Sequence, residues 1–462
     1  MKADLKISAA DIIKITGGLL LTGNQDTLIE TVTTDSRELN VNNLFIPIKG
    51  EKFDGHDFLE ELIVSRRISC ALTEDASLKE IAEKKGVTLI KCTDTLEALG
   101  KIGKGHRDSL SPLVVGITGT NGKTTTKELI HAVLSSKYKT HKNIKNYNNE
   151  IGVPFSLMEM KKEHEAAVIE MGMNHIGEIE RLSMMVQPDI GIITNIGAGH
   201  LEFLESVEGV AYAKTEILKG MKKGSTLIVN RDTECFSIVS SLCEEMGMKM
   251  VTFGLNSDAH IFPESYKPGV ESMEIVYKNT LITVPLYGRH NAYNVMAAIA
   301  LAEITGISPD KVAFALAGFE SIGGRSEIIN KGYYLINDTY NSNPLSSLFA
   351  VDSMCEVFPD NRKIAVLSDM KELGESSALY HVKIGEIVAS RNFDMILLFG
   401  EMASFYEKGA LQMGFPADKI ITFEKKEDIA DFLKADLKSG DVVLVKGSRS
   451  MQMEDVVNRL DN

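Results

Sequence analysis

The chain has 462 residues, of which 44% are hydrophobic, so it has enough apolar side chains for the cores of two to four globular domains. Its formal net charge of -14 argues against a general nucleic-acid-binding or acidic-membrane-binding surface, although a local basic pocket for an anionic substrate is still allowed. The composition therefore limits the partners without naming one.

The cysteines and the N-terminal residues indicate the cellular compartment in which the protein is expected. Five cysteines are scattered without a C-x-x-C pair, which indicates neither a disulfide framework nor a zinc site and fits a reducing cytoplasm. The opening residues, MKADLKISAADIIKITGG, mix charged and apolar side chains as no signal-peptide core does, and no later run is long enough to span a membrane. We therefore expect a cytoplasmic protein with no nucleic-acid partner and no membrane insertion.

A first domain boundary is predicted at the polar, glycine- and proline-marked segment 103–112, which makes residues 1–108 a separate N-terminal domain. The sequence VVGITGTNGKTTTK follows at residues 114–127: an apolar run, a glycine-spaced turn, then Lys-Thr opening a helical pattern. This is how a loop that binds a nucleoside triphosphate is built.

The spacing of this loop departs from the general G-x-x-x-x-G-K-[ST] pattern, because Ile117 stands five residues before Gly122 and the nearest upstream glycine is Gly119. We interpret it as a shortened variant in which Lys123 reaches the outer phosphates and the Thr124 hydroxyl binds Mg²⁺. A plain solvent-exposed glycine turn is the alternative, and the intact Gly-Lys-Thr between strand and helix argues against it.

Apolar strand candidates at 166–172, 189–197, 225–230 and 249–254 alternate with helical stretches, which predicts a parallel sheet covered by helices. The period-two pattern at 272–288, centred on Lys278 and Asn279, predicts a hairpin appended to that sheet. Further strand candidates at 333–337, 363–368, 395–400 and 442–447 predict a second open α/β domain, whose ligands would bind at the carboxyl ends of its strands.

Two side chains of the central part allow two interpretations each, and a third is most simply a surface residue. Glu170 ends a strand and is either a Mg²⁺ ligand or a solvated acid, with neither favoured. His200 follows another strand and is either a metal ligand or, more simply, a hydrogen-bonded loop histidine. Lys214 lies in a helical pattern, where a single lysine normally faces solvent.

Polar segments farther along the chain are candidates for ligand binding. Residues 288–291 offer donors before a helix, although a hairpin exit with Asn291 as helix cap explains them almost as well. Arg325 follows two glycines and is either a phosphate clamp or a linker residue. The loops 337–344, 368–374 and 446–454 each follow a strand, so they are expected at one edge of the C-terminal sheet, with ordinary turn chemistry as the alternative for each.

The motifs GTNGKTT, EMG, GHLE, YAK, GRHNAYN, GGR, DTYNSNP, SDMKELG and KGSR, in this order, closely resemble the Mur ligases of peptidoglycan synthesis across nearly the whole chain. The segments at 148–157 and 170–179, together with YNSNP and KGSR, look like those of the members that add D-alanyl-D-alanine. The resemblance implies three α/β domains: 1–108 for the UDP end of the substrate, a P-loop-type domain at 109–325 for ATP, and a Rossmann-like domain at 326–462 that closes over ATP and binds the incoming dipeptide.

The same resemblance implies the roles of individual residues. Lys123, His200, Lys214 and Arg325 would be catalytic. Lys214, carried as a carbamate, would join Thr124, Glu170 and His200 in holding two Mg²⁺ ions. The ATP contacts would be Gly119, Thr120, Asn121, Gly122, Lys123, Thr124, Thr125, Asn291, Arg325 and Asp338. The substrate contacts would be Ser36 and Arg37, within TTDSREL (33–39) and near KGEKFDGHDF (49–58), and Asn148, Asn341, Asn343 and Ser448.

The resemblance implies a monomeric, ADP-forming ligase that joins D-alanyl-D-alanine to UDP-MurNAc-tripeptide through an acyl phosphate. A sibling or polyglutamate-type ligase with another amine, a small-molecule kinase and a non-ligating nucleotide-binding regulator are the alternatives. The chain departs from the commoner family pattern at four positions, and these departures bear on loop geometry more than on catalytic identity. They are Phe203, Asn337, Ser342 and Ser368.

Overall fold

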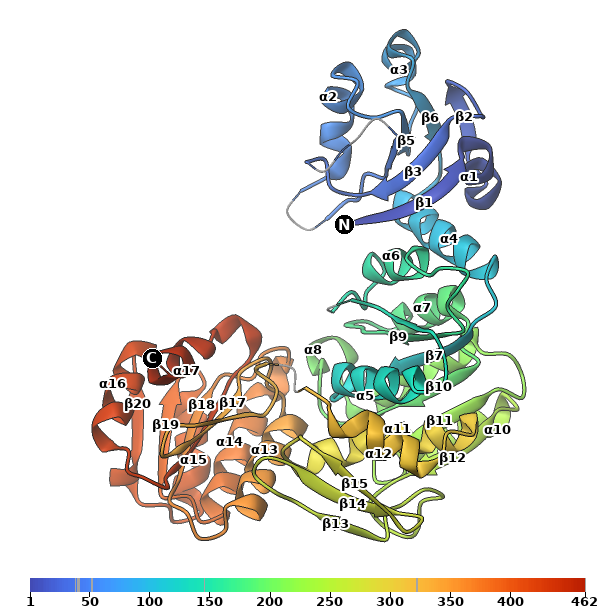
Figure 1. The fold of residues 1–462 in the computed structure, drawn as a ribbon. Coiled ribbons are helices and arrows are strands. Elements are labelled where there is room, and N and C mark those ends of the chain that lie inside the picture. Colours follow the sequence, from blue (N-terminus) through green and yellow to red (C-terminus); the bar gives the residue numbers. More distant parts are fainter. Residues whose placement is uncertain (38, 40–41, 51–52, 145, 321–322, 462) are drawn as a thin grey trace.

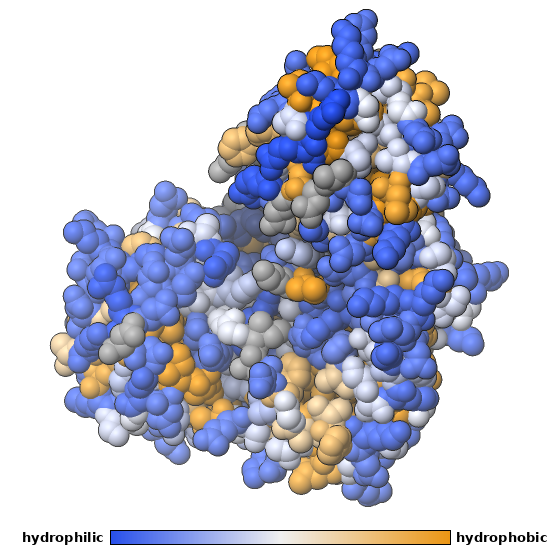
Figure 2. Space-filling model, turned by 45° about the horizontal axis from the view of Figure 1, so that its top comes forward, coloured by the Kyte–Doolittle hydropathy of each residue, from blue (hydrophilic) through white to orange (hydrophobic). Residues whose placement is uncertain are grey.

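The computed structural model describes residues 1–37, 39, 42–50, 53–144, 146–320 and 323–461. The chain forms three α/β units in sequence order, with the N-terminal unit above the central unit and the C-terminal unit beside it (Figure 1). Figure 2 shows a mainly hydrophilic face with a hollow between the N-terminal and C-terminal units. None of the helices in the described ranges is long and apolar enough to cross a membrane.

The N-terminal unit is built on a six-stranded sheet of order β1-β3-β4-β5-β6-β2, parallel in its centre and antiparallel at both edges. Its strands are β1 Lys2–Ser8, β2 Leu19–Thr22, β3 Leu28–Thr33, β4 Asn43–Phe45, β5 Cys70–Thr73 and β6 Thr88–Lys91. Its helices are α1 Ala9–Thr16, η1 Gly55–Phe58, α2 Leu59–Val64, α3 Lys79–Lys85 and α4 Thr95–Asp108.

Helix α4 joins this unit to the central one. It begins where the Asp94 carboxylate accepts the Glu97 N–H, and it ends at Asp108, so six of the ten residues at the predicted domain boundary, 103–112, are helical. A Cβ added to Gly103 would lie 2.7 Å from the Pro154 Cα, which shows how closely α4 packs on the next unit. Phe155 of that unit lies in the hydrophobic core of the N-terminal sheet.

The central unit contains a six-stranded sheet of order β12-β11-β10-β7-β9-β8 in which every pair is parallel, as the sequence pattern predicts. Its strands are β7 Leu113–Thr118, β8 Thr140–Lys142, β9 Ala166–Glu170, β10 Ile190–Ile193, β11 Thr226–Asn230 and β12 Lys249–Phe253. Its helices are α5 Lys123–Ser135, α6 Gly152–Met158, α7 Glu178–Val186, α8 Leu201–Leu204, α9 Val207–Thr215, η2 Glu216–Gly220, α10 Phe236–Glu245, α11 Arg289–Thr305 and α12 Pro309–Ala317.

Strand side chains alternate between two cores. Val114 and Ile169 pack on the face covered by α6, α7 and α9, whereas Val115 and Ile117 pack on the face covered by α5 and α11. The predicted hairpin is present, and its turn residues Lys278 and Asn279 have φ of 50° and 60°. It does not join the main sheet, because β14 Met273–Tyr277 and β15 Thr280–Val284 pair with the unpredicted β13 Ser265–Lys267 in a separate sheet.

The C-terminal unit has a six-stranded sheet of order β16-β17-β21-β18-β19-β20, parallel except for β16. Its strands are β16 Glu327–Asn330, β17 Tyr334–Asp338, β18 Lys363–Ser368, β19 Met395–Phe399, β20 Ile420–Phe423 and β21 Val442–Lys446. Its helices are α13 Pro344–Val357, η3 Gly374–Ser376, α14 Ser377–Ser390, α15 Ala403–Gln412, η4 Ala417–Lys419, α16 Lys426–Asp436, η5 Arg449–Met451 and α17 Glu454–Asp461.

Helices α14 and α15 pack with their backbones in close approach, and this generates a stability prediction. A Cβ at Gly409 would lie 2.0 Å from the Val382 carbonyl oxygen, so Gly409→Ala should lower the free energy of unfolding by about 1–3 kcal/mol. Gly318→Ala is the control, because nothing lies within 4 Å of a Cβ there. Urea unfolding followed by circular dichroism measures both, and a Gly409→Ala protein as stable as the control would contradict the packing.

Candidate active site

The phosphate loop joins β7 to α5 at the carboxyl edge of the central sheet. Gly119 has φ of 147° and Gly122 has φ of 76°. A Cβ at Gly119 would lie 1.9 Å from Thr194 Oγ1, and one at Gly122 would lie 2.3 Å from Asn294 Oδ1. No side chain caps the first turn of α5, so its N–H groups are available to an anion.

Lys123 opens α5 and folds back over the loop. Its Nζ donates to the carbonyl oxygens of Gly119 at 2.8 Å and Thr120 at 3.1 Å. Burial is the main cause that lowers the pKa of this amine, and the nearby Glu170 carboxylate opposes that effect. An anionic ligand on the loop would favour the protonated, positively charged form of this amine.

Glu170 ends β9 beside the loop and is almost wholly buried. Its Oε1 accepts from Thr124 Oγ1 at 3.2 Å and from Asn148 Nδ2 at 2.8 Å. Its Oε2 has no hydrogen-bond partner and lies 3.7 Å from Nζ of Lys127, which is itself fully buried. A solvated acid, one of the two interpretations of the sequence, is therefore excluded.

Lys214 lies on α9 and is fully buried, and its Nζ is without a hydrogen-bond partner in the described chain. The expectation of a solvent-facing lysine is therefore wrong. Burial, followed by repulsion from Lys123, lowers the pKa of this amine well below its usual value, although Glu178 and Glu216 act in the opposite direction. Burial and the neighbouring cation therefore both favour the uncharged form of the Lys214 amine.

His200 precedes α8 with φ of 54° and lies between the central and C-terminal units. Its Nδ1 is 2.7 Å from Oε2 of Glu372. Burial lowers the pKa of the imidazole despite the Glu372 carboxylate, which favours the neutral ring. A neutral imidazole in this position can be a metal ligand.

The donor set fits Mg²⁺ bound together with a nucleotide. Among the described residues, no three His, Cys, Asp or Glu side chains gather closely enough to hold a metal by themselves. Mg²⁺ commonly takes only one or two protein oxygens and completes its shell with phosphates and water. Thr124 and the unpartnered oxygen of Glu170 satisfy that requirement.

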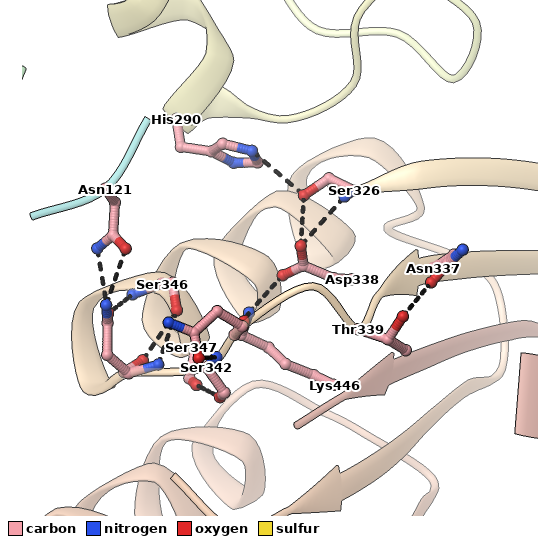
Figure 3. Close-up of polar contacts among 12 residues, drawn as sticks. Asn121, His290, Ser326, Asn337, Asp338, Thr339, Ser342, Ser346, Ser347 and Lys446 are labelled. Atoms are coloured by element: carbon pink, nitrogen blue, oxygen red, sulfur yellow. Dashed lines mark hydrogen bonds and ion pairs between the residues drawn. The ribbon is translucent and has the colours of Figure 1, made fainter. Parts of the chain in front are cut away.

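The C-terminal unit contacts the phosphate loop directly. Asn121 Nδ2 donates to Asn343 Oδ1 at 3.1 Å, and Asn343 Nδ2 donates back to Asn121 Oδ1 at 2.8 Å (Figure 3). Asn343 also caps α13 by accepting the Ser346 N–H. One residue therefore fixes the start of a C-terminal helix and its contact with the loop.

Arg325 lies between the two units. Its guanidinium carbon stands 3.7 Å from the centre of the Tyr340 ring, and its Nε is buried without a hydrogen-bond partner. Stacking on an aromatic face holds a guanidinium plane while leaving its N–H groups free for oxygen atoms.

Asp338 belongs to a polar chain that crosses from α11 to the C-terminal sheet (Figure 3). It accepts from the Ser326 N–H at 3.1 Å and pairs with the buried Lys446 at 2.5 Å. The Ser326 hydroxyl lies 3.2 Å from His290 Nε2, and burial lowers the pKa of His290 to about 4.

Two adjoining cavities collect most of the predicted residues, and Asn121, Gly122, Arg325 and Asn341 line both. The cavity on the α11 side is also lined by Thr125, Asn291 and Asp338. The other, of about 310 Å³, is also lined by Thr120, Lys123, Thr124, Asn148, Glu170, His200 and Asn343.

Some predicted residues do not line these cavities. Ser36 and Arg37 lie in the N-terminal unit, where the exposed Arg37 pairs with Asp35 at 2.7 Å. Positions 38, 51 and 52 of the two uridine-side segments lie outside the described residues. Ser448 supports the loops instead, because its hydroxyl accepts the Lys371 N–H and donates to the Ser342 carbonyl.

Other cavity residues were missed by sequence reasoning. Asn294 donates to Asn291 Oδ1 at 2.9 Å and accepts from Thr126, and its place one helical turn after Asn291 could have identified it. Lys446 and Tyr340 sit inside motifs that were noted, but the pairing of Lys446 with Asp338 spans 108 positions and leaves no local signal.

Three of the four departures from the family pattern have local contacts. The Phe203 ring lies 4.5 Å from that of His175, and Asn337 donates to Glu327 and accepts from Thr339. The Ser342 hydroxyl lies 3.1 Å from that of Ser347. Ser368 differs, because its buried hydroxyl has no hydrogen-bond partner among the described residues.

Comparison with known proteins matches three family models to the chain: the Mur ligase family catalytic domain at 28–107, the Mur ligase middle domain at 117–302, and the Mur ligase glutamate ligase domain at 324–449. A UDP-N-acetylmuramoyl-tripeptide--D-alanyl-D-alanine ligase from Bacillus subtilis (strain 168) is 36% identical over 94% of each chain. The enzyme of that name from Escherichia coli (strain K12) is 32% identical over 94% of each chain.

Solved structures are similar over the same extent. A crystal structure of MurF from Acinetobacter baumannii aligns with a TM-score of 0.88 at 28% identity, covering 99% of both chains. MurF from Thermotoga maritima in complex with ADP aligns with a TM-score of 0.82 at 27% identity, covering 93% of this chain and 96% of that one. Because the family models cover most of the chain and full-length relatives are more than 30% identical to it, the chain belongs to the Mur ligase family.

Proposed function

We propose that the chain uses ATP to join D-alanyl-D-alanine to UDP-MurNAc-tripeptide, giving ADP, phosphate and UDP-MurNAc-pentapeptide in peptidoglycan precursor synthesis. One observation carries the proposal. The phosphate loop of the central unit lines the same cavity as Arg325 and Asn343, and Asn343 of the C-terminal unit is hydrogen-bonded to that loop. The names of the full-length relatives support the choice of substrates.

The reaction has two steps. An oxygen of the tripeptide carboxylate attacks the terminal phosphorus of ATP and ADP leaves. The dipeptide amine then attacks the carbonyl carbon of the acyl phosphate, phosphate leaves, and the nitrogen loses a proton as the amide forms. Phosphorylation is needed because oxide is too poor a leaving group.

The residues have separable roles in this proposal. Lys123 and the N–H groups of the loop would bind the phosphates, and Arg325 would stabilise the transferring group. Thr124, Glu170, His200 and a carbamylated Lys214 would hold two Mg²⁺ ions, which supply charge neutralisation when bound. Asn148, Asn341 and Asn343 would position the substrates.

The proposal assigns the adenosine to the α11 side, with Asn291 and Asp338 as contacts. Ser36 and Arg37 would contact the UDP end of the substrate, and Ser448 would shape the dipeptide site. A monomer in the cytoplasm fits this function.

The carbamate on Lys214 is supported by the state of its amine. Attack of an uncharged Nζ on CO₂ forms a C–N bond, and loss of a proton leaves an anionic carboxylate. The amine is fully buried and unpartnered, and its lowered pKa favours the uncharged form that this addition requires. The product would replace a buried amine by a metal-binding oxygen pair.

The central prediction concerns the amine. With ATP, Mg²⁺ and UDP-MurNAc-tripeptide, addition of D-alanyl-D-alanine should release free phosphate. The mass of the UDP-linked product, measured by mass spectrometry, should increase by the mass of the dipeptide less one water. Phosphate release with another amine only would indicate a sibling ligase. A stable phosphorylated product without free phosphate would indicate a kinase, and ATP binding without turnover would indicate a regulator.

Lys123→Ala should reduce ligation by about 100-fold or more, because it removes the cation that faces the phosphates. Steady-state phosphate release measures the loss. Lys222→Ala, which changes an exposed lysine outside the cavities, is the matched control. Near-normal turnover of the Lys123 variant would refute its assigned role.

Lys214→Ala should reduce turnover by about 100-fold, and short carboxylic acids should restore part of it by occupying the vacated space. Nuclear magnetic resonance with ¹³C-labelled bicarbonate should detect a carbamate in the wild type and lose that signal in the variant. The exposed Lys219→Ala is the control. Absence of the signal in active wild-type enzyme would exclude the modification.

A further inference from the structure

The contact between His200 and the 368–374 loop joins the catalytic cavity to the C-terminal unit. Helix α8, which His200 precedes, stands at the side of the central unit nearest the C-terminal unit (Figure 1). The Glu372 carbonyl accepts the Glu202 N–H at 3.2 Å, so the loop docks on α8 through its backbone. The Glu372 carboxylate is then brought within 2.7 Å of His200 Nδ1.

The two nitrogens of His200 have different surroundings. Nδ1 is buried, and Glu372 is the charged group paired with it among the described residues, as an ion-pair contact rather than a hydrogen bond. A carboxylate beside one imidazole nitrogen favours the proton there and leaves the other nitrogen as an acceptor. His200 also lines the cavity that contains Lys123 and Glu170.

The loop that carries Glu372 is itself rigidly held. Asp369 is fully buried and accepts the N–H of Met402 at 3.0 Å, and the Met370 N–H donates to His381 Nε2 at 2.9 Å. Leu373, next to Glu372, is buried in the core. The position of the Glu372 carboxylate is therefore set by the fold of the C-terminal unit.

We propose that Glu372 is a positioning residue that orients His200, so that docking of the C-terminal loop completes the metal-binding side of the active site. The proposal rests on the proposed function for the role of His200 as a metal ligand. It adds that the orientation of the His200 ring depends on the C-terminal unit as well as on the central unit. Glu372 itself does not touch the substrate or the ion.

The test compares Glu372→Ala and the nearly isosteric Glu372→Gln with Glu375→Ala, a control at an exposed position three residues farther along. Binding of Mn²⁺ in the presence of a non-hydrolysable ATP analogue is measured by electron paramagnetic resonance, and the Mg²⁺ dependence of ligation is measured separately. Thermal unfolding reports on folding.

Glu372→Ala should weaken Mn²⁺ binding and raise the half-saturating Mg²⁺ concentration by about 10–100-fold. Glu372→Gln should show a smaller effect because its amide oxygen can still face Nδ1, and Glu375→Ala should match the wild type. KM for the tripeptide should change little, which separates orientation of His200 from general damage.

Unchanged Mn²⁺ binding and Mg²⁺ dependence in both Glu372 variants would overturn the proposal, as would a fall in thermal stability with no effect on metal binding. If the wild type does not ligate, the proposed function fails. The Mn²⁺ measurement still decides the role of Glu372 in that case, because it needs no turnover.

Discussion

The active site depends on the absence of side chains from two positions of one loop. Thr194 and Asn294 occupy the space that a side chain at Gly119 or Gly122 would need. Thr194 also donates to the Asn121 carbonyl at 2.6 Å, and Asn195 accepts the Asn121 N–H at 2.9 Å. The loop is thus clasped by the segment after β10 and by α11, and its N–H groups are oriented before any ligand arrives, which reduces the reorganisation needed during reaction.

Charge is the second constraint. The amines of Lys123 and Lys214 are both buried, and burial lowers the pKa of each, with repulsion from Lys123 lowering that of Lys214 further. Glu170, near Lys123, offers one oxygen without a hydrogen-bond partner. Burying such groups is costly unless a ligand or a modification balances them. The architecture therefore stores an electrostatic imbalance that phosphates, cations and a carbamate would relieve together.

The sequence could predict the parts of this site that are local and could not predict those that depend on distant packing. Long apolar strands such as Ala166–Glu170 and Lys363–Ser368 were recognisable, whereas the three-residue strands β8 and β13 carry too little pattern. Burial of Lys214 was invisible because a helical lysine is normally exposed. The mutual hydrogen bonds of Asn121 and Asn343, 222 positions apart, follow only from how two sheets are placed.

The resemblance to a family suggested roles for individual residues that the hydrophobic periodicity of the sequence could not suggest. It favoured the metal-ligand interpretation of Glu170 and His200 where the residues alone left two, and it named Lys214 as a candidate site residue. It did not indicate Asn294 or Glu372, because each residue also has a partner outside its own motif: Asn294 accepts from Thr126 on the helix that follows the loop, and Glu372 contacts His200 of another unit.

The packing of α4 on α6 sets the distance between the N-terminal and central units. Gly103 lies against Pro154, and Phe155 fills part of the N-terminal core, so the first two units share side chains across their junction. They cannot slide past each other without opening that core. The spacing between the N-terminal and central units is therefore fixed by side chains at their junction, and any molecule that contacted both units would have to match that spacing.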